Sequence, residues 1–435
     1  MSLTSKASLH FGQYAISFHA LVYNLASICQ FYDPGLVVRI IGLFEGHISS
    51  FGVLRGELSA SFLLTSLHLY ETSQPHDKSF AIYGILSQTG LPLPKPDYEK
   101  PLADAYRELT RLVVEHDGSA QVFSSLNGTS STPGLPSWCP DYAQQYSNMA
   151  RFICADICGN SKPSWNFSDD GRQLHLRGIL VDRIESSVDH SFREIKPPDI
   201  HQPAVDAYIV ARDAFWGNSF QSLMKDKSPL WFIYEVMKLQ ELVEFADESN
   251  SGDDEGANEP EALYCCLEGQ PRLAKERWNA WRSWHKCLVL GEAGSGKDAP
   301  LPSEEGQRKR LLKNIKYYCD TYPTPNERPV MQALKLVAQS PHTVSVHQQA
   351  LSTAHYKTLF KTVGGRLGIA AQSVKVGDEV ALFTGVEMAM VVRPVGDGGD
   401  YEDHYRFVSA AYVHGTAKGE LWPADEGFLK RFVIV

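Results

Sequence analysis

The chain has 435 residues, of which 43% are hydrophobic and 21% charged, and its formal net charge is -10 at pH 7. This balance is ordinary for globular proteins and leaves room for two or three separately packed units. The negative charge excludes nucleic acid as an expected partner, because no basic stripe attracts a phosphate backbone. No apolar run reaches the ~18 residues that span a bilayer, and no signal peptide is recognisable, so we expect a cytoplasmic protein without membrane insertion.

Three helices are predicted in the first third of the chain. Apolar residues recur at helical spacing in residues 18–31 and 54–70, and residues 102–114 place an apolar stripe opposite charged side chains. The next segment, residues 124–140, is rich in serine, threonine, glycine and proline. That composition predicts an exposed loop that ends near Trp138.

The middle of the chain mixes element types. Residues 173–184 alternate polar and apolar side chains before an apolar run, which predicts a strand with a bulge or bend at Gly178. Helical spacing returns over residues 203–245. Residues 246–262 then carry several carboxylates and almost no apolar side chain, as in an acidic flexible linker.

The last part of the chain consists of short β-rich runs at residues 376–383, 388–395 and 405–415, separated by glycine turns. If these runs pair antiparallel, their apolar side chains are buried. Closure into a barrel, or cover by the helices upstream, would bury both faces of the sheet. The side chains expected in this core are Val380, Leu382, Val391, Val392, Phe407, Val408, Tyr412 and Val413.

These patterns predict an α+β fold, with helical N-terminal and central units and a small antiparallel β unit at the C-terminus. The expected division is a helical unit at residues 1–145, a mixed helix and strand unit at 146–245, the acidic linker at 246–262, helical segments at 263–350 around a Gly/Pro-rich loop at 291–307, and the β unit at 351–435.

Two motifs in the first third and a set of residues near the end of the chain resemble one known family. The first motif, residues 75–85, reads PHDKSFAIYGI and is followed by Pro96, Asp97 and Tyr98. The second motif, residues 135–142, reads LPSWCPDY. Together with the terminal residues, these motifs resemble the region that follows the HET core in fungal heterokaryon-incompatibility (HET) proteins. The residues that carry the resemblance are Asp77, Lys78, Gly84, Asp97, Tyr98, Pro136, Ser137, Trp138, Pro140, Asp141, Gly377, Asp378, Tyr412, His414, Gly415, Gly419 and Glu420.

The resemblance implies a role in non-self recognition, and it also has departures. His76, Ala389 and the pair Thr416-Ala417 stand where the family usually has Arg, Pro and Ile-Met. The Leu-Ser-Tyr-x-Trp-Gly and Ile-Asp-x-x-Cys-Ile-Asn-Gln motifs of the HET core are missing from the sequence. We therefore expect a chain that begins just after the core, as a truncated relative, a degraded copy or a tail that acts alone. Its expected role is regulatory or partner-binding, without catalytic activity of its own. A degenerate remnant with no activity is an alternative.

Each motif also has a purely physical interpretation. Asp77, after Pro75, suits a cap for an apolar helix at residues 80–86. Trp138 lies in a proline-stiffened segment and is expected to anchor its loop on a core. The dipeptide Gly377-Asp378 is most simply a tight turn before a strand.

A competing signal comes from residues 291–297, which fit the phosphate-loop pattern G-x-x-x-x-G-K with Gly291, Gly296 and Lys297 at its fixed positions. Asp298 replaces the hydroxyl that would bind magnesium, and two prolines follow that prevent an ordinary helix. We therefore expect a surface loop here, and NTP binding by these residues is the alternative function.

No other group of residues predicts chemistry. The eight cysteines include no C-x-x-C pair, which favours reduced, buried thiols over a zinc site. His414 beside Glu420 could suggest metal or proton chemistry, and Cys139 could be a nucleophile, but neither has supporting spacing. We expect no enzyme activity, no cofactor and no metal, and other proteins as partners.

Overall fold

The computed structural model describes residues 8–11, 14–17, 59–65, 67, 72–87, 90–144, 157–159, 161–189, 229–247, 261–269, 273, 275–290, 346–347, 349–351, 353–354, 357–396 and 403–435. Predictions that fall elsewhere lie outside the described residues. They include the helix at 18–31, residues 203–228 of the helical stretch at 203–245, the loop at 291–307 with its phosphate-loop pattern, and residues 248–260 of the acidic linker at 246–262.

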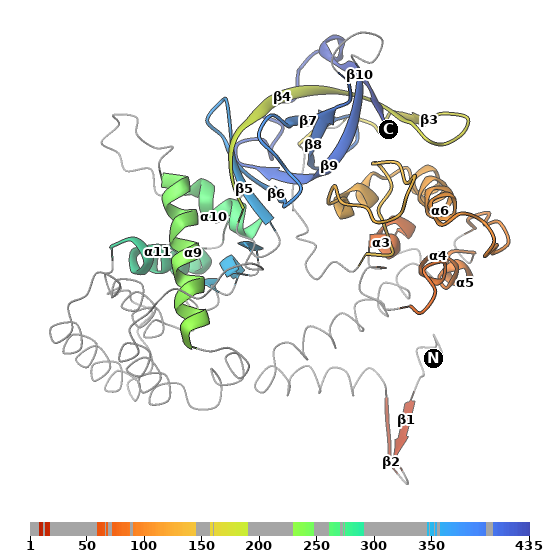
Figure 1. Ribbon diagram of the computed structural model, residues 1–435, viewed down its shortest axis with the longest axis horizontal. Helices are drawn as coiled ribbons and strands as arrows, with labels where there is room; N and C mark the ends of the chain where they lie inside the picture. Colours follow the sequence, from red (N-terminus) through yellow and green to blue (C-terminus); the bar gives the residue numbers. More distant parts are fainter. Residues whose placement is uncertain are drawn as a thin grey trace.

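Six strands close into a barrel in the C-terminal part (Figure 1). The pairing runs antiparallel from β4 through β5, β6, β9, β8 and β7, and β7 pairs back with β4. β10 joins β4 and a short stretch of β9, and β3 pairs with the start of β4. The bounds are β3 Trp165–Phe167, β4 Leu174–Asp189, β5 Lys357–Thr362, β6 Leu367–Ala371, β7 Glu379–Phe383, β8 Ala389–Pro394, β9 His404–Val413 and β10 Lys430–Ile434.

The strand predicted at residues 173–184 is present as β4, and it is part of the C-terminal sheet. Its start pairs with β10, its middle with β7 and its end with β5. Gly178 lies where β10 and β7 meet on β4, and a Cβ there would be 2.3 Å from the carbonyl oxygen of Leu382. Two bulges follow further along β4, so the glycine serves close strand approach and is not itself the bulge. A strand so distant in sequence shows that the sheet draws on residues 146–245 as well as on the end of the chain.

The expected pairing of the three C-terminal runs is confirmed. They form β7, β8 and β9, and all eight side chains expected in their core are buried. Alternate residues of β7 and β8 pack in two different clusters of buried apolar side chains. In β7, Val380 and Leu382 belong to one cluster, and Ala381 and Phe383 belong to the other. Both faces are therefore covered, as the weak alternation of these runs predicts.

Helices from the first third of the chain cover one side of the barrel (Figure 1). Their apolar side chains pack in the same buried cluster as Ala381 and Phe383 of β7. The predicted helix at residues 102–114 is confirmed as α6, which begins after Pro101 and ends at Gly118, a left-handed C-cap with φ 59°. The short 3₁₀ helix η3 contacts β9 directly. The bounds are α3 Ala60–Thr65, α4 Asp77–Phe80, α5 Tyr83–Leu86, α6 Leu102–Asp117 and η3 Gln121–Ser125.

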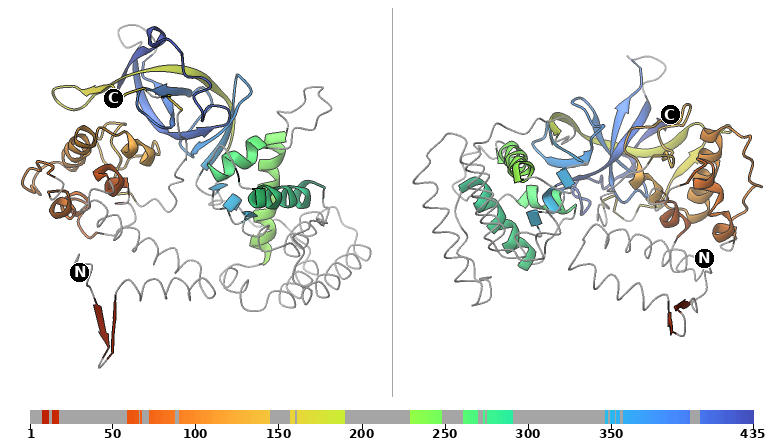
Figure 2. Two further views of the ribbon diagram at one scale, coloured as in Figure 1. Left: turned by 180° about the vertical axis from the view of Figure 1, so that it is seen from behind. Right: turned by 60° about the horizontal axis from the view of Figure 1, so that its bottom comes forward.

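A second helical group lies on the other side of the barrel, as both views of Figure 2 show. It comprises α9 Pro229–Asp247, α10 Glu261–Glu268 and α11 Lys275–His285, followed by a π-helical turn at Lys286–Leu290. α10 packs on β6, where the Cys266 thiol donates to the carbonyl oxygen of Leu367 at 3.6 Å. Trp281 and Trp284 are fully buried in this cluster.

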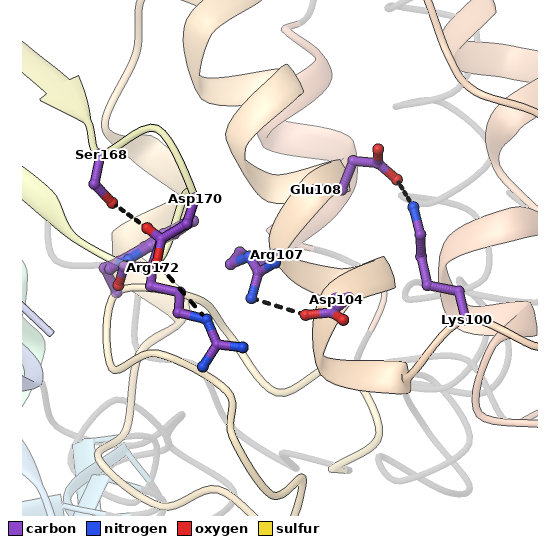
Figure 3. Close-up of polar contacts among 8 residues, drawn as sticks. Lys100, Asp104, Arg107, Glu108, Ser168, Asp170 and Arg172 are labelled. Carbon is purple, nitrogen blue, oxygen red and sulfur yellow. Dashed lines mark hydrogen bonds and ion pairs between the residues drawn. The ribbon is translucent and has the colours of Figure 1, made fainter.

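The turn between β3 and β4 lies beside the polar side of α6 (Figure 3). Ser168 donates to Asp170 at 2.7 Å, and on α6 Arg107 pairs with Asp104 at 2.8 Å. A Cβ at Gly171, which has φ 65°, would lie 3.4 Å from the Arg111 guanidinium. The guanidinium of Arg111 on α6 also lies 5.5 Å from the centre of the Phe167 ring of β3, so the β hairpin contacts the helices through a cation–π contact.

Two further observations complete the architecture. β1 Ser8–Phe11 and β2 Tyr14–Ser17 form a two-stranded hairpin that the sequence analysis did not anticipate. Among the residues that the structure describes, none of the helices combines the length and the apolar character that crossing a membrane requires.

Candidate functional site

A polar cavity of about 310 Å³ lies where the second motif meets the barrel. Three pieces of chain line it: the serine- and threonine-rich segment at 125–130, which we call the hydroxyl loop, the second motif at 135–142, which we call the motif loop, and the strands β8 and β9. The motif residues Pro136, Ser137, Pro140 and Asp141 all line this cavity. Segments far apart in sequence therefore build one site.

Asp141 organises the loops around the cavity. Its side chain is buried, and its Oδ2 accepts from the backbone N–H groups of Ser131 at 2.8 Å and Thr132 at 3.0 Å. Its Oδ1 accepts from the Thr132 hydroxyl at 2.9 Å and from the Ala143 N–H at 3.1 Å. A buried carboxylate needs such donors, because an unpaired charge would be costly. Asp141 therefore fixes the turn at residues 130–132 and is not open to a ligand.

Ser137 and Trp138 attach the motif loop to the barrel. The Phe407 N–H of β9 donates to the Ser137 hydroxyl oxygen at 3.0 Å, and that hydroxyl donates to the main-chain oxygen of Val435. Trp138 is fully buried, packs against the ring of Phe167 in a tilted arrangement at 4.8 Å, and donates its indole N–H to the carbonyl oxygen of Arg172 at 3.2 Å. The expected anchor role of Trp138 is thus supported by its surroundings.

The hydroxyl loop makes a second attachment. The Ser373 hydroxyl, in the turn after β6, donates to the carbonyl oxygen of Asn127. Gly128 has φ 68°, and a Cβ there would lie 2.6 Å from the Val408 carbonyl oxygen. Only glycine suits this contact, since the backbone is left-handed and pressed against β9. The loop expected to be exposed at residues 124–140 is exposed only at 128–131 and 133–134, because the barrel covers the rest.

Two arginines form the barrel wall of the cavity. Arg393 of β8 and Arg406 of β9 are directly opposite each other in the antiparallel register. Arg393 makes a two-pronged ion pair with the buried Asp378, with Nε to Oδ1 at 2.6 Å and Nη2 to Oδ2 at 2.8 Å. The hydrogen bond to Asp378 raises the pKa of Arg393. Arg406 is exposed, and its side chain has no ion pair or hydrogen bond among the described residues.

Comparison with known families agrees with this arrangement. Residues 304–432 match the model of the Het-6 beta-barrel domain. The C-terminal part of the chain is a HET-related region. No curated protein and no solved structure matches the chain. The resemblance to HET-related proteins predicted from the terminal residues is confirmed for this part. The matched range does not include β4, although β4 closes the Het-6 barrel.

Cys139, beside the cavity, is not suited to nucleophilic chemistry. Burial raises the pKa of its thiol to about 12, because a thiolate would be poorly solvated there. The thiol lies 3.2 Å from the Thr110 hydroxyl, which is also 2.9 Å from the hydroxyl of Tyr142. Cys139 is therefore part of a buried polar contact between α6 and the motif loop.

The first motif lies away from the cavity and joins helices to one another. Asp77 is the first residue of α4 and accepts from the Tyr98 hydroxyl at 2.7 Å. The N-cap residue is His76 and makes no side-chain cap bond, so the capping role expected for Asp77 is wrong. The apolar helix expected at 80–86 is divided into α4 and α5. Lys78 is buried and donates to the carbonyl oxygen of Leu67 at 3.1 Å.

The remaining residues of the first motif have local roles. Asp97 accepts from the Glu99 N–H at 3.0 Å, which closes a turn. Gly84 lies within α5, where a Cβ would meet nothing within 4 Å. None of these contacts reaches the barrel, so the first motif supports the helical side of the molecule.

The terminal motif residues lie against α10, on the other side of the Het-6 barrel. Burial raises the pKa of Cys265 to about 11, and the neighbouring Tyr412 opposes this shift. Burial also lowers the pKa of His414, and the carboxylates of Glu261 and Glu420 oppose this shift. Gly415 and Gly419, with φ 81° and 74°, form the turn after β9. Gly377, with φ 92°, likewise makes the expected turn before β7.

Sequence reasoning missed the two partners that matter most at the cavity. Neither Arg393 nor Arg406 was predicted as a site residue. Asp378 lies directly before β7 and Arg393 lies near the end of β8. In an antiparallel pair of strands these two positions are opposite each other, so an acid and a base there indicate a cross-strand ion pair. Nothing in the sequence indicates that the hydroxyl loop covers them. Among the described residues, no group of three or more His, Cys, Asp or Glu side chains could hold a metal ion.

Proposed function

We propose that this chain is a regulatory or partner-binding protein of a fungal heterokaryon-incompatibility system, without catalytic activity of its own. The observation that carries the proposal is the cavity between the motif loop and the Het-6 barrel. Its wall combines residues of the family motif with barrel residues, so a ligand there would contact both parts of the chain. Such a site can report on or respond to the docking of the two parts.

The state of the candidate catalytic groups supports a non-enzymatic role. The thiol of Cys139 has a pKa of about 12 and is therefore protonated at neutral pH. Nucleophilic cysteines need the opposite, a lowered pKa and an adjacent base. The motif carboxylates Asp141 and Asp378 are occupied by internal donors. These carboxylates fix the shape of the site, and their oxygen atoms are not available for acid or base chemistry on a ligand.

The proposal includes a cytoplasmic location, protein partners and helical N-terminal and central units. The helices α3–α6 and α9–α11, which flank the barrel, are consistent with the last point. The alternatives are an NTP-binding protein that uses residues 291–297 and a degenerate remnant with no activity.

The proposal is tested in a fungal host that carries a HET protein with an intact core. Expression of this chain alone should leave cells alive, and co-expression should change the death response to the HET protein. The variant Cys139→Ala should act like the wild type, because its thiol has no chemical role. Death caused by this chain alone, or an unchanged response on co-expression, would contradict the proposal. Magnesium-dependent ATP binding that is lost in Lys297→Ala would favour the alternative.

A further inference from the structure

Arg393 and Arg406 form an unusual pair, since two positive side chains directly opposite on antiparallel strands repel each other. Asp378 offsets the charge of Arg393 through two hydrogen bonds. No described residue does the same for Arg406. One positive charge therefore remains at the wall of the cavity.

The other wall of the cavity offers neutral hydrogen-bonding groups. The hydroxyl loop contributes Asn127, Thr129 and Ser130, which line the cavity together with the arginines. The hydroxyls of Thr129 and Ser130 donate to Asn127 and Asp141, so the side-chain N–H group of Asn127 is the donor that this wall offers to a ligand. Asp141 is the one acidic residue among the lining residues, and its oxygens are turned to the N–H and hydroxyl groups of residues 130–132 and to the Ala143 N–H. The accessible charge is therefore that of Arg406, next to the half-exposed guanidinium of Arg393.

The size of the cavity also limits the ligand. A volume of about 310 Å³ is at the small end of ligand pockets, which begin at ~300 Å³. It accommodates a compact group and excludes a large cofactor. Guanidinium groups bind planar or tetrahedral oxyanions through parallel N–H bonds, which suits a small anionic group.

We propose that this cavity binds an oxyanion group, a phosphate or carboxylate, with Arg406 as its main anchor and the hydroxyl loop as the opposite wall. This inference rests on the proposed partner-binding function and names the chemistry of the group that is recognised. The group can come from a small free anion or from an acidic or phosphorylated side chain of a protein.

The test uses the purified full chain and calorimetric titration with inorganic phosphate, succinate and a phosphoserine peptide. We expect saturable binding of at least one probe. Arg406→Gln should weaken it at least about tenfold, because a charge-assisted bond is lost. The affinity of Arg406→Lys should lie between those of the wild type and Arg406→Gln, since lysine keeps the charge and lacks the planar guanidinium group. The matched control is Arg431→Gln, an exposed arginine of β10 that contacts His175 outside the cavity and should bind like wild type.

The outcomes separate the possible sources and the possible failures. A phosphoserine peptide that binds more than tenfold tighter than phosphate would identify a protein side chain, and equal affinities would identify a free anion. The inference is overturned if no probe binds the wild type, or if Arg406→Gln binds as well as the wild type, or if Arg431→Gln weakens binding equally. Thermal melts of each variant show whether it is folded. Anion binding without any effect on the death response would refute the proposed function alone, and the reverse result would refute this site alone.

Discussion

The two sides of the Het-6 barrel are covered by helices in different ways. On the side of α6, polar groups make many of the contacts: Ser137 joins β9, and Ser373 joins the hydroxyl loop. On the side of α10 and α11, aromatic rings pack the two helices on each other, with Trp281 stacked on Tyr264 at 5.5 Å and edge-on to Trp284 at 5.1 Å. Among the described residues, polar contacts between the barrel and this side are few, such as the hydrogen bond from the Cys266 thiol to Leu367 of β6.

The comparison shows that two kinds of contact have different roles: apolar burial stabilises the packing, and hydrogen bonds fix how the helices are oriented on the barrel. Apolar contacts depend mainly on the area removed from water and tolerate small shifts. Hydrogen bonds at the motif loop require fixed atom positions, because a buried donor left without its acceptor is costly. The motif loop therefore sets how the helices meet the barrel, and it does so next to the cavity that Arg406 lines. The aromatic cluster on the other side contributes stability through burial.

The largest effect is expected from removing the central ring on either side. Trp138→Ala and Trp281→Ala should each lower the free energy of unfolding by about 3–5 kcal/mol, since both side chains are fully buried. Only Trp138→Ala should also free the motif loop, so that limited proteolysis cuts near residues 127–141. Urea unfolding and peptide mapping measure the two effects. Equal protection of that loop in both variants would show that the two sides do not differ.

A smaller loss is expected at the ion pair behind the cavity. Asp378→Ala leaves Arg393 facing Arg406 without a counter-charge, and we expect a loss of about 3 kcal/mol, at the low end for a broken buried pair because Arg393 is half-exposed. The double variant Asp378→Ala, Arg393→Ala should recover part of it, since the repulsion is removed. Urea unfolding of the wild type, the two single variants and the double variant completes this double-mutant cycle. If the losses of the single variants add up to the loss of the double variant, Asp378 and Arg393 do not stabilise each other.

The contact of the hydroxyl loop with β9 should be next in size. Gly128→Ala should cost about 2 kcal/mol, because it strains a left-handed residue and its Cβ would collide with the Val408 carbonyl. The matched control is Gly134→Ala, which has φ 78° but open space around its Cβ and should cost less. Thermal melts compare the two. Equal losses would mean that backbone strain alone matters and that the close approach to β9 does not.

The smallest effect, when it is expressed per pH unit, is that of alkaline pH. The pKa of Cys139 is raised to about 12 in the folded chain, so its contribution is complete below its ordinary pKa and is lost as pH rises toward 12. From pH 9 upward, the wild type should lose up to about 1.4 kcal/mol per pH unit more than Cys139→Ala. Urea unfolding at pH 8, 9, 10 and 11 measures this slope. Parallel slopes for the two proteins would show that the thiol is not buried at the motif loop.

The sequence by itself determined the local elements. The apolar stripe of α6, with Pro101 before it and Gly118 after it, fixes a helix through spacing and terminal residues alone. The glycine turns around β7, β8 and β9 likewise fix short paired strands, and the proline-flanked Trp138 indicates an anchored loop. These features depend on neighbouring residues, so a pattern read along the chain contains them.

Only the tertiary structure decided how these elements combine. β4 closes the barrel from more than 160 residues before its partner β5, and no local pattern encodes such a partner. The role expected for Asp77 failed for the same reason, because its partner Tyr98 is reached through space and not through the helix that follows. Arg406 looks like any surface arginine in the sequence. Its position opposite Arg393, beneath a loop from the other end of the chain, exists only once long-range strand pairing has set the register.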